Sequence, residues 1–342
     1  MPAAEIPYEV FALALETTRG TAVTPPTHLL PFAGAITPVR EKYRPDESRG
    51  TLAEFYRSKT VRTSSKISGD GGLDPNYAPL VYNMVMKPVT SPTTPTSGVL
   101  TRLWTFVPTM NNDDLKSATF YSGDPNVQVF QAAYGMADNL KVDCDATSTD
   151  GVTWSLDATA QFPARVAAPT FPAQNIGNLL IPGAMQLWID TASAIGTTEI
   201  TGRVVSTSWS IPTGVTYKYY ANGPTGGRGF TKTGRKRRHA EVTVVFELND
   251  LSIGVGTEYR LWEADTSVKM RVRLNGDAIE TVAGPLTYYY YTEIDIYGPL
   301  DALAWGDVEG SNRTMEFTVQ SEYDATAGAD YVLRAQNTRT TL

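Results

Sequence analysis

The sequence is poor in the residues on which most enzymes and metal sites depend. Its 342 residues include one cysteine, Cys144, and two histidines, His28 and His239. A single cysteine excludes an intramolecular disulfide and is typical of a protein made in a reducing compartment. Neither histidine has a nucleophile or a second metal ligand at a recognisable spacing. We therefore expect no enzyme activity, no cofactor and no metal site.

Long hydrophobic runs are missing as well. No apolar stretch approaches the roughly 20 residues that a membrane-spanning helix needs. The first residues, MPAAEIPYEVFALALE, have neither a basic beginning nor a long apolar core. We therefore expect no signal peptide and no membrane partner.

Two short motifs come close to ligand-binding patterns without matching them. Residues 229–236, GFTKTGRK, put Arg235 and Lys236 where a phosphate-binding loop has Lys and a hydroxyl residue, and a strand pattern follows instead of a helix. Residues 143–151, DCDATSTDG, lack the Gly and the final Glu of a calcium loop. A hairpin turn explains the second motif better.

Charge is unevenly distributed along the chain. The formal net charge is −7, yet no acidic residue lies between Glu199 and Glu241, and seven basic residues lie from Lys218 to Arg238. The rest of the chain therefore carries 22 − 36 = −14. An acidic body with one basic segment can attract copies of itself, whereas a general DNA-binding protein is basic over a whole face.

Alternation of apolar and polar residues predicts a mainly β protein. Residues 140–145 and 152–159 alternate on either side of an Asp-Gly turn, which predicts a hairpin. Residues 202–211, 241–248, 293–296 and 314–320 alternate in the same way. Helical patterns are short and few, at 76–87 and 257–265.

The order of these elements predicts an internal duplication. In each half a strand (around 33–39, then 202–211) leads into a long polar loop that ends in basic residues. A second strand, a short helix and a closing pair of strands follow. Arg57 and Arg62 precede Lys232 and Arg237 by 175 residues. We expect one β domain at 1–165, a Pro-rich linker at 166–183, and a second β domain at 184–342 with a basic loop at 218–239.

Two segments resemble the tail tube (major tail) proteins of long, flexible-tailed bacteriophages. Residues 15–38, LETTRGTAVTPPTHLLPFAGAITP, are similar to the family's N-terminal region, with Glu, Gly-Thr, a Pro/Thr run and Leu-Pro before the first strand. Residues 185–211 also resemble it, with a strand ending at Asp190, then Gly-Thr-Thr and a strand that opens a long loop. The chain is about twice the length of the common single-domain subunit.

The resemblance implies two tandem tail-tube-like β-sandwich or partial-barrel domains, each with one short helix and a long polar loop. It also implies a homo-oligomer, in which three duplicated chains would form a pseudo-hexameric ring and rings would stack into a tube. The protein would be part of the virion tail, assembled in the host cytoplasm. Its partners would be the tape measure, tail tip and tail terminator proteins, with double-stranded DNA passing through the lumen during ejection.

The resemblance also suggests roles for the charged residues. An acidic or neutral lumen lets DNA slide, because it does not neutralise phosphates. The lumen-facing candidates are polar-face acids: Asp143, Asp157, Glu241, Glu247, Glu293, Asp295, Glu316 and Glu322. The candidates for contacts between subunits or rings are basic: Arg57, Lys59, Arg62, Arg228, Lys232, Arg235, Lys236, Arg237 and Arg238. Single exposed ion pairs contribute only ~0–1 kcal/mol, so apolar and backbone contacts must do most of the holding.

Two other functions remain open from sequence. A β-rich DNA-binding module could use the basic loop at 228–238, which predicts strong and salt-dependent binding to free duplex. A carbohydrate-binding or hydrolytic β-sandwich could present the tyrosines of YYYY (288–291), but such a site also needs a cleft. Core and interface packing is the simpler explanation of those tyrosines.

Overall fold

The structure is a computed structural model of the chain. It describes residues 9–31, 33–45, 58–95, 99–108, 115–173, 177–191, 194–221, 224–247, 257–282, 286–307 and 313–342. The protein is mainly β, with large antiparallel sheets and short helices, as the alternation predicts. Among the described residues no helix is both long and apolar enough to cross a membrane.

The first half of the chain holds eight strands that pair within it, one extra strand (β5) that pairs with the second half, and one helix. They are β1 (Val10–Leu15), β2 (His28–Leu29), β3 (Ala33–Tyr43), β4 (Lys59–Gly72), α1 (Ala78–Val85), β5 (Arg102–Phe106), β6 (Ala118–Asp124), β7 (Gln128–Asp145), β8 (Thr153–Ala160) and β9 (Ala164–Val166). The predicted hairpin around the Asp-Gly turn is confirmed, because β7 and β8 pair with Val142 opposite Trp154.

The second half repeats this order and adds a small hairpin. Its elements are a 3-10 turn (Pro182–Ala184), β10 (Met185–Asp190), β11 (Glu199–Ile200), β12 (Val204–Pro212), β13 (Val215–Lys218), α2 (Pro224–Gly227), β14 (Lys232–Arg235), β15 (Glu241–Glu247), α4 (Glu258–Glu263), β16 (Ser267–Thr281), β17 (Thr287–Asp307), β18 (Arg313–Gln320) and β19 (Tyr331–Asn337). Both predicted helical segments, 76–87 and 257–265, contain a helix.

Seven strand pairings of the first half recur in the second. Strand β1 pairs with β2 and β6, β6 with β7, and β7 with β9; likewise β10 pairs with β11 and β16, β16 with β17, and β17 with β19. The other three, β3–β4, β4–β8 and β8–β7, correspond to β12–β15, β15–β18 and β18–β17. The two halves thus have the same pairing pattern.

The halves also pair with each other. Strand β7 pairs with β12 and strand β19 pairs with β5. The first of these pairings creates one continuous eight-stranded sheet in the order β3–β4–β8–β7–β12–β15–β18–β17, which we call the shared sheet. Only the second part of β17, Leu300–Asp307, belongs to it. The strand order of one half therefore continues directly into that of the next.

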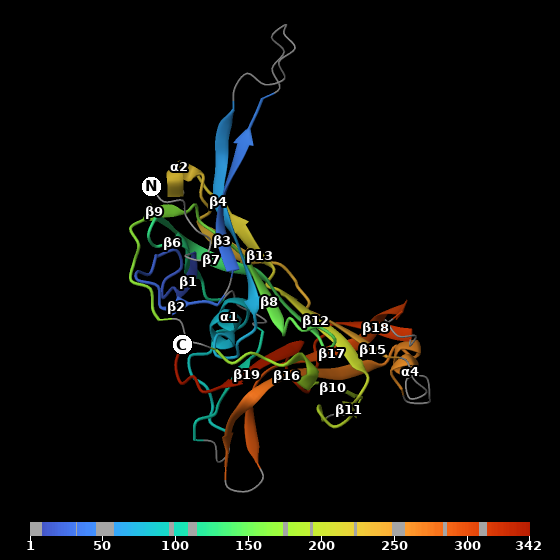
Figure 1. The fold of residues 1–342 in the computed structure, drawn as a ribbon. Helices are drawn as coiled ribbons and strands as arrows, with labels where there is room; N and C mark the ends of the chain where they lie inside the picture. Colours follow the sequence, from blue (N-terminus) through green and yellow to red (C-terminus); the bar gives the residue numbers. More distant parts are fainter. Residues whose placement is uncertain are drawn as a thin grey trace.

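A single large hydrophobic core lies behind the shared sheet and reaches across both halves. It includes Trp154 from the first half, Trp209 and Phe317 from the second, and the whole of α1. Helix α1 lies at the centre of the molecule, whereas α4 lies at its periphery (Figure 1). The segment 166–183, predicted to be a linker, therefore connects two halves that are in contact, because their strands pair and their side chains share one core.

Candidate assembly surfaces

The junction between the halves shows how one repeat joins the next. Strand β7 runs antiparallel to β12 from Asp145 opposite Ser206 to Asn139 opposite Pro212. In the middle of this ladder Val142 lies opposite Trp209, and both side chains are buried. Backbone hydrogen bonds and a buried apolar row therefore hold the two repeats together.

The two ends of the shared sheet are open. Strand β3 pairs with β4 on one side, and the Leu300–Asp307 part of β17 pairs with β18 on one side. Within the described residues neither strand has a second partner in this sheet. An unpaired edge offers backbone donors and acceptors to another chain. In the order of the shared sheet, β3 begins the strands of the first repeat and β17 ends those of the second, so these two edges would meet if the repeat continued.

The basic loop of the second half folds back onto the first half. Phe230 is fully buried in a cluster with Leu115, Tyr134 and Met136 of the first half. The ring centroids of Phe230 and Tyr134 lie 5.1 Å apart. The backbone of the loop is also held, since the Thr63 amide donates to the carbonyl of Arg228 at 3.0 Å. The loop is thus a docked segment, anchored by an aromatic side chain.

The cations of this loop divide into two groups. Arg235 donates to the carbonyl of Thr213 at 2.8 Å and Arg238 donates to the Tyr331 hydroxyl, so both are bound within the chain. The remaining four predicted contact residues of the loop are exposed: Arg228, Lys232, Lys236 and Arg237. Only this second group is in a position to contact another molecule.

The first-half counterpart of the loop is the β3–β4 hairpin, which extends away from the body of the protein (Figure 1). Lys59 is exposed on β4, and Arg62 lies 3.6 Å from Glu41 and stacks on Tyr219. Arg57 lies outside the described residues. The loop at 213–240 packs on the repeat before it. The described tip-side part of the β3–β4 hairpin has no preceding repeat to pack on, and its residues Arg62 and Thr63 contact the second-half loop instead.

Five of the eight lumen candidates lie on one face of the shared sheet. Opposite its core, this open face has the cross-strand row Asp143, Ser208, Thr243 and Thr318. Along β7, β8, β12, β15 and β18, and along β4 where it pairs with β8 (residues 65–72), the paired residues of this face include two basic ones, Lys66 and Lys141. Its seven acidic residues are Asp70, Asp143, Asp145, Asp157, Glu241, Glu247 and Glu316. The face is thus hydroxyl-rich and net acidic.

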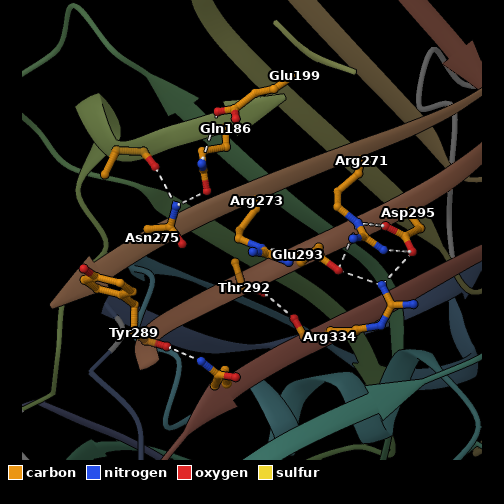
Figure 2. A network of polar contacts seen from close by, with 12 residues as sticks. Gln186, Glu199, Arg271, Arg273, Asn275, Tyr289, Thr292, Glu293, Asp295 and Arg334 are labelled. Carbon is orange, nitrogen blue, oxygen red and sulfur yellow. Dashed lines mark hydrogen bonds and ion pairs between the residues drawn. The ribbon is translucent and has the colours of Figure 1, made fainter. Parts of the chain in front are cut away.

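Glu293 and Asp295 do not lie on that face, and the prediction that they line a wet surface is wrong. They belong to the first part of β17, where Asp295 is 0% and Glu293 1% exposed. Figure 2 shows three arginines closing over them from the neighbouring strands. Arg271 contacts Asp295 at 2.6 Å, and Arg334 contacts both carboxylates at 2.6 Å. Alternation correctly put both carboxylates on the side of β17 opposite Ile294 and Ile296. It cannot show whether that side is hydrated or covered by arginines.

The electrostatics of this cluster favour the charged states. Burial acts to lower the pKa of Arg271 and of Arg334, but the hydrogen bonds and charges of the two carboxylates outweigh it and raise both. Arg273 is also part of the cluster, because it lies 2.5 Å from Glu293.

Glu322, the eighth lumen candidate, is exposed in the connection between β18 and β19, outside the strands.

The two segments that carry the family resemblance have the same local structure. Glu16 follows β1 and accepts from the Gly20 amide at 2.7 Å and from the Tyr134 amide at 2.8 Å. Asp190 ends β10 and accepts from the amides of Gly196 and Thr198 at 2.7 and 2.8 Å. Burial acts to raise the pKa of Asp190, but the hydrogen bonds outweigh it and hold this pKa below its usual value. Each carboxylate organises the loop after the first strand of its repeat.

A partly exposed aromatic patch was not predicted from the sequence. Tyr259 lies between Trp262 and Trp305, with ring centroids 5.7 and 6.1 Å away. Trp262 also donates from its indole nitrogen to the carbonyl of Asp301 at 2.8 Å, and Trp305 is 52% exposed. We call these three residues the α4 patch. The only sequence signal was the apolar spacing in TEYRLWEAD, which does not reveal an open edge beside it.

Two groups that often serve in catalysis, the Cys144 thiol and the His28 imidazole, have pKa values far from neutral. Burial and the charge of Asp145 raise the pKa of the Cys144 thiol to about 12. Burial and the neighbouring Arg339 lower the pKa of His28 to about 4. Among the described residues, no group of three His, Cys, Asp or Glu side chains is arranged to hold a metal ion.

Comparison with known proteins does not assign this chain to a family. No protein-family model matches the sequence, and no curated protein matches it significantly.

Proposed function

We propose that the protein is a structural subunit of a phage-type tail tube, in which copies join through the ends of the shared sheet and enclose a passage for double-stranded DNA. The main support is the head-to-tail order of the sheet, β3–β4–β8–β7 followed by β12–β15–β18–β17. A repeat that joins to the next by its last and first strands makes a heterologous contact, which forms a ring when the rotation from one repeat to the next closes. Three chains with two repeats each would give a pseudo-hexameric ring.

The charge of the open face supports the same function. If the rings close with this face inward, phosphates meet seven acidic and two basic residues per chain on the six strands described above. Such a wall neutralises few phosphates, so it binds DNA weakly and lets it slide. Tandem tail-tube-like domains are thus the interpretation that accounts for both the repeated pairings and the acidic face.

The exposed cations of the basic loop have a role in stacking. Lys232, Lys236 and Arg237 are exposed, and the open face and much of the remaining chain are acidic. Their attraction for an acidic neighbour would speed encounter and fix register more than it would add affinity. The tape measure, tail tip and terminator proteins would bind the ends of such a tube in the virion tail.

Electron microscopy of the concentrated, purified protein tests this function. We expect hollow filaments of uniform width, built of rings, and little binding of the subunit to free duplex DNA. Bare monomers that bind duplex in a strongly salt-dependent way would instead support a DNA-binding module that uses the basic loop. Filament growth should slow and lose salt dependence when Lys232, Lys236 and Arg237 are changed to Ser, whereas Lys87→Ser, exposed elsewhere, should have little effect.

A further inference from the structure

We propose that the α4 patch and the free edge of β17 receive strand β3 of a second copy of this chain, in a register that puts Trp305 opposite Ile36. This inference rests on the proposed ring and specifies which residues close it. At the internal junction between β7 and β12, one repeat covers the other. At the free edge of β17 the equivalent side chains are uncovered.

The two repeated helices differ sharply in burial. All eight residues of α1 are buried, and Tyr82 of α1 hydrogen-bonds through its hydroxyl to Thr292 in the second half. Helix α4 occupies the equivalent place after β15, but its apolar residues Tyr259, Leu261 and Trp262 are only partly buried. The second repeat contacts α1, whereas the described residues contain no third repeat that contacts α4.

The bulged pairs align the two repeats residue by residue. Strands β7 and β17 each bulge next to the buried pairs Ala137–Ala158 and Leu300–Val319. Ala158 lies opposite Ile67, and Val319 opposite Val242, so β4 and β15 correspond at an offset of 242 − 67 = 175. Gly69, opposite Leu156, and Val244, opposite Phe317, give the same offset, 244 − 69 = 175.

This alignment identifies the contact that is missing at the open end. Ile36 lies opposite Ile67, and Trp209 opposite Val242, so Ile36 corresponds to Trp209. In the same way Trp305, opposite Met315, corresponds to Val142, opposite Trp154. Since Val142 and Trp209 face each other inside the chain, Trp305 and Ile36 should face each other between chains.

The exposure of Trp305 and the charges along the two edges agree with β3 of a second copy as the partner of β17. Val142 is 2% exposed inside the junction, whereas Trp305, its counterpart, is 52% exposed. Continuing the register places Arg40 of the incoming β3 beside Asp301 of β17, which are of opposite charge. Pro38 lacks an amide hydrogen, so the ladder between copies would have one donor fewer at that position. A second copy is the favoured occupant because this chain already contains both sides of the equivalent contact.

Disulfide cross-linking tests the register. The pair Lys141–Ser210 of the internal junction corresponds to Ala304–Thr37 between copies, and both of these residues are exposed. In a Cys144→Ser background, the double variant Ala304→Cys with Thr37→Cys should give covalent dimers and trimers on oxidation, with no larger closed species. Directly opposite residues lie ~4.5–5.5 Å apart between Cα atoms, within disulfide reach. The control, Ala304→Cys with Ala35→Cys, is displaced by two residues and should cross-link at least tenfold more slowly.

A substitution in the patch tests its contribution independently. Trp305→Ser should raise the protein concentration needed for assembly at least tenfold, with an unchanged circular dichroism spectrum of the monomer. Tyr323→Ser, an exposed aromatic outside the patch, should change it less than twofold. Normal tubes from Trp305→Ser, or equal cross-linking of the two cysteine pairs, would overturn the register while leaving the tube function intact. Failure of the unchanged protein to form any ring or tube would overturn both.

Discussion

Replacing Asp295 with Asn should destabilise the fold, because this carboxylate is the shared partner of two arginines. It is 0% exposed and accepts from Arg271 at 2.6 and 2.9 Å and from Arg334 at 2.6 Å. Removing one member of a buried ion pair typically costs about 3–5 kcal/mol. The two arginine side chains are 17% and 22% exposed, so they can turn partly toward water. We therefore expect a cost at the lower end, about 3 kcal/mol.

The assay is equilibrium unfolding in urea, followed by tryptophan fluorescence. The variant should shift the midpoint with little change in slope, because the area exposed on unfolding is nearly the same. Asp157→Asn, an exposed residue of the open face, is the matched control and should change stability by less than about 0.5 kcal/mol. If Asp295→Asn costs less than about 1 kcal/mol, the cluster does not contribute as its geometry indicates.

A double variant separates lost attraction from the cost of an unpaired charge. Asp295→Leu with Arg271→Met removes both partners of one pair and should recover part of the loss, since apolar replacement of a buried pair is often close to neutral. A double variant less stable than Asp295→Asn would show that the attraction itself is the larger effect.

Three further predictions concern the loop, the β16–β17 ribbon and the open face. Phe230→Ala should lower the free energy of unfolding by about 3–5 kcal/mol, because it empties the pocket that anchors the basic loop. It should also speed trypsin cleavage at Lys236 and Arg237. Tyr220→Ala, an exposed residue of the same loop, should do neither. The hydrogen bond from the Thr101 hydroxyl, together with those from backbone amides, lowers the pKa of Glu280 to about 2. These hydrogen bonds should therefore be fully formed above the ordinary pKa of 4.5 and lost as the pH falls toward 2. Amide chemical shifts of Val99, Leu100 and Thr101 should report that loss, and should not titrate in this range in Glu280→Gln. Asp157→Lys with Glu316→Lys should make assembled tubes bind duplex, with the slope of log K against log salt steeper by about 0.9 per new phosphate contact, whereas Glu322→Lys, outside the open face, should not. Unchanged DNA binding by the first pair would contradict an inward-facing open face.

Local patterns were sufficient for the elements that depend on neighbouring residues. Alternation around the Asp-Gly turn predicted the β7–β8 hairpin, and apolar spacing predicted α1 and α4, because strand and helix periodicity are written in adjacent side chains. The offset of 175 residues noted for the basic segments is also the offset that relates β4 to β15 in the structure. The chain's own order therefore determined its class and its repeating pattern.

Contacts between distant segments were decided only by the tertiary structure. Phe230 enters a pocket that includes Tyr134, about a hundred residues earlier, so a loop that the sequence describes as basic and polar is in fact anchored by an aromatic ring. Asp295 and Asp157 have the same alternating pattern, yet one lies under arginines from adjacent strands and the other is exposed. Burial and ion pairing depend on which strands become neighbours. No single strand contains the side chains that will cover its own, so these contacts form only when the whole core packs.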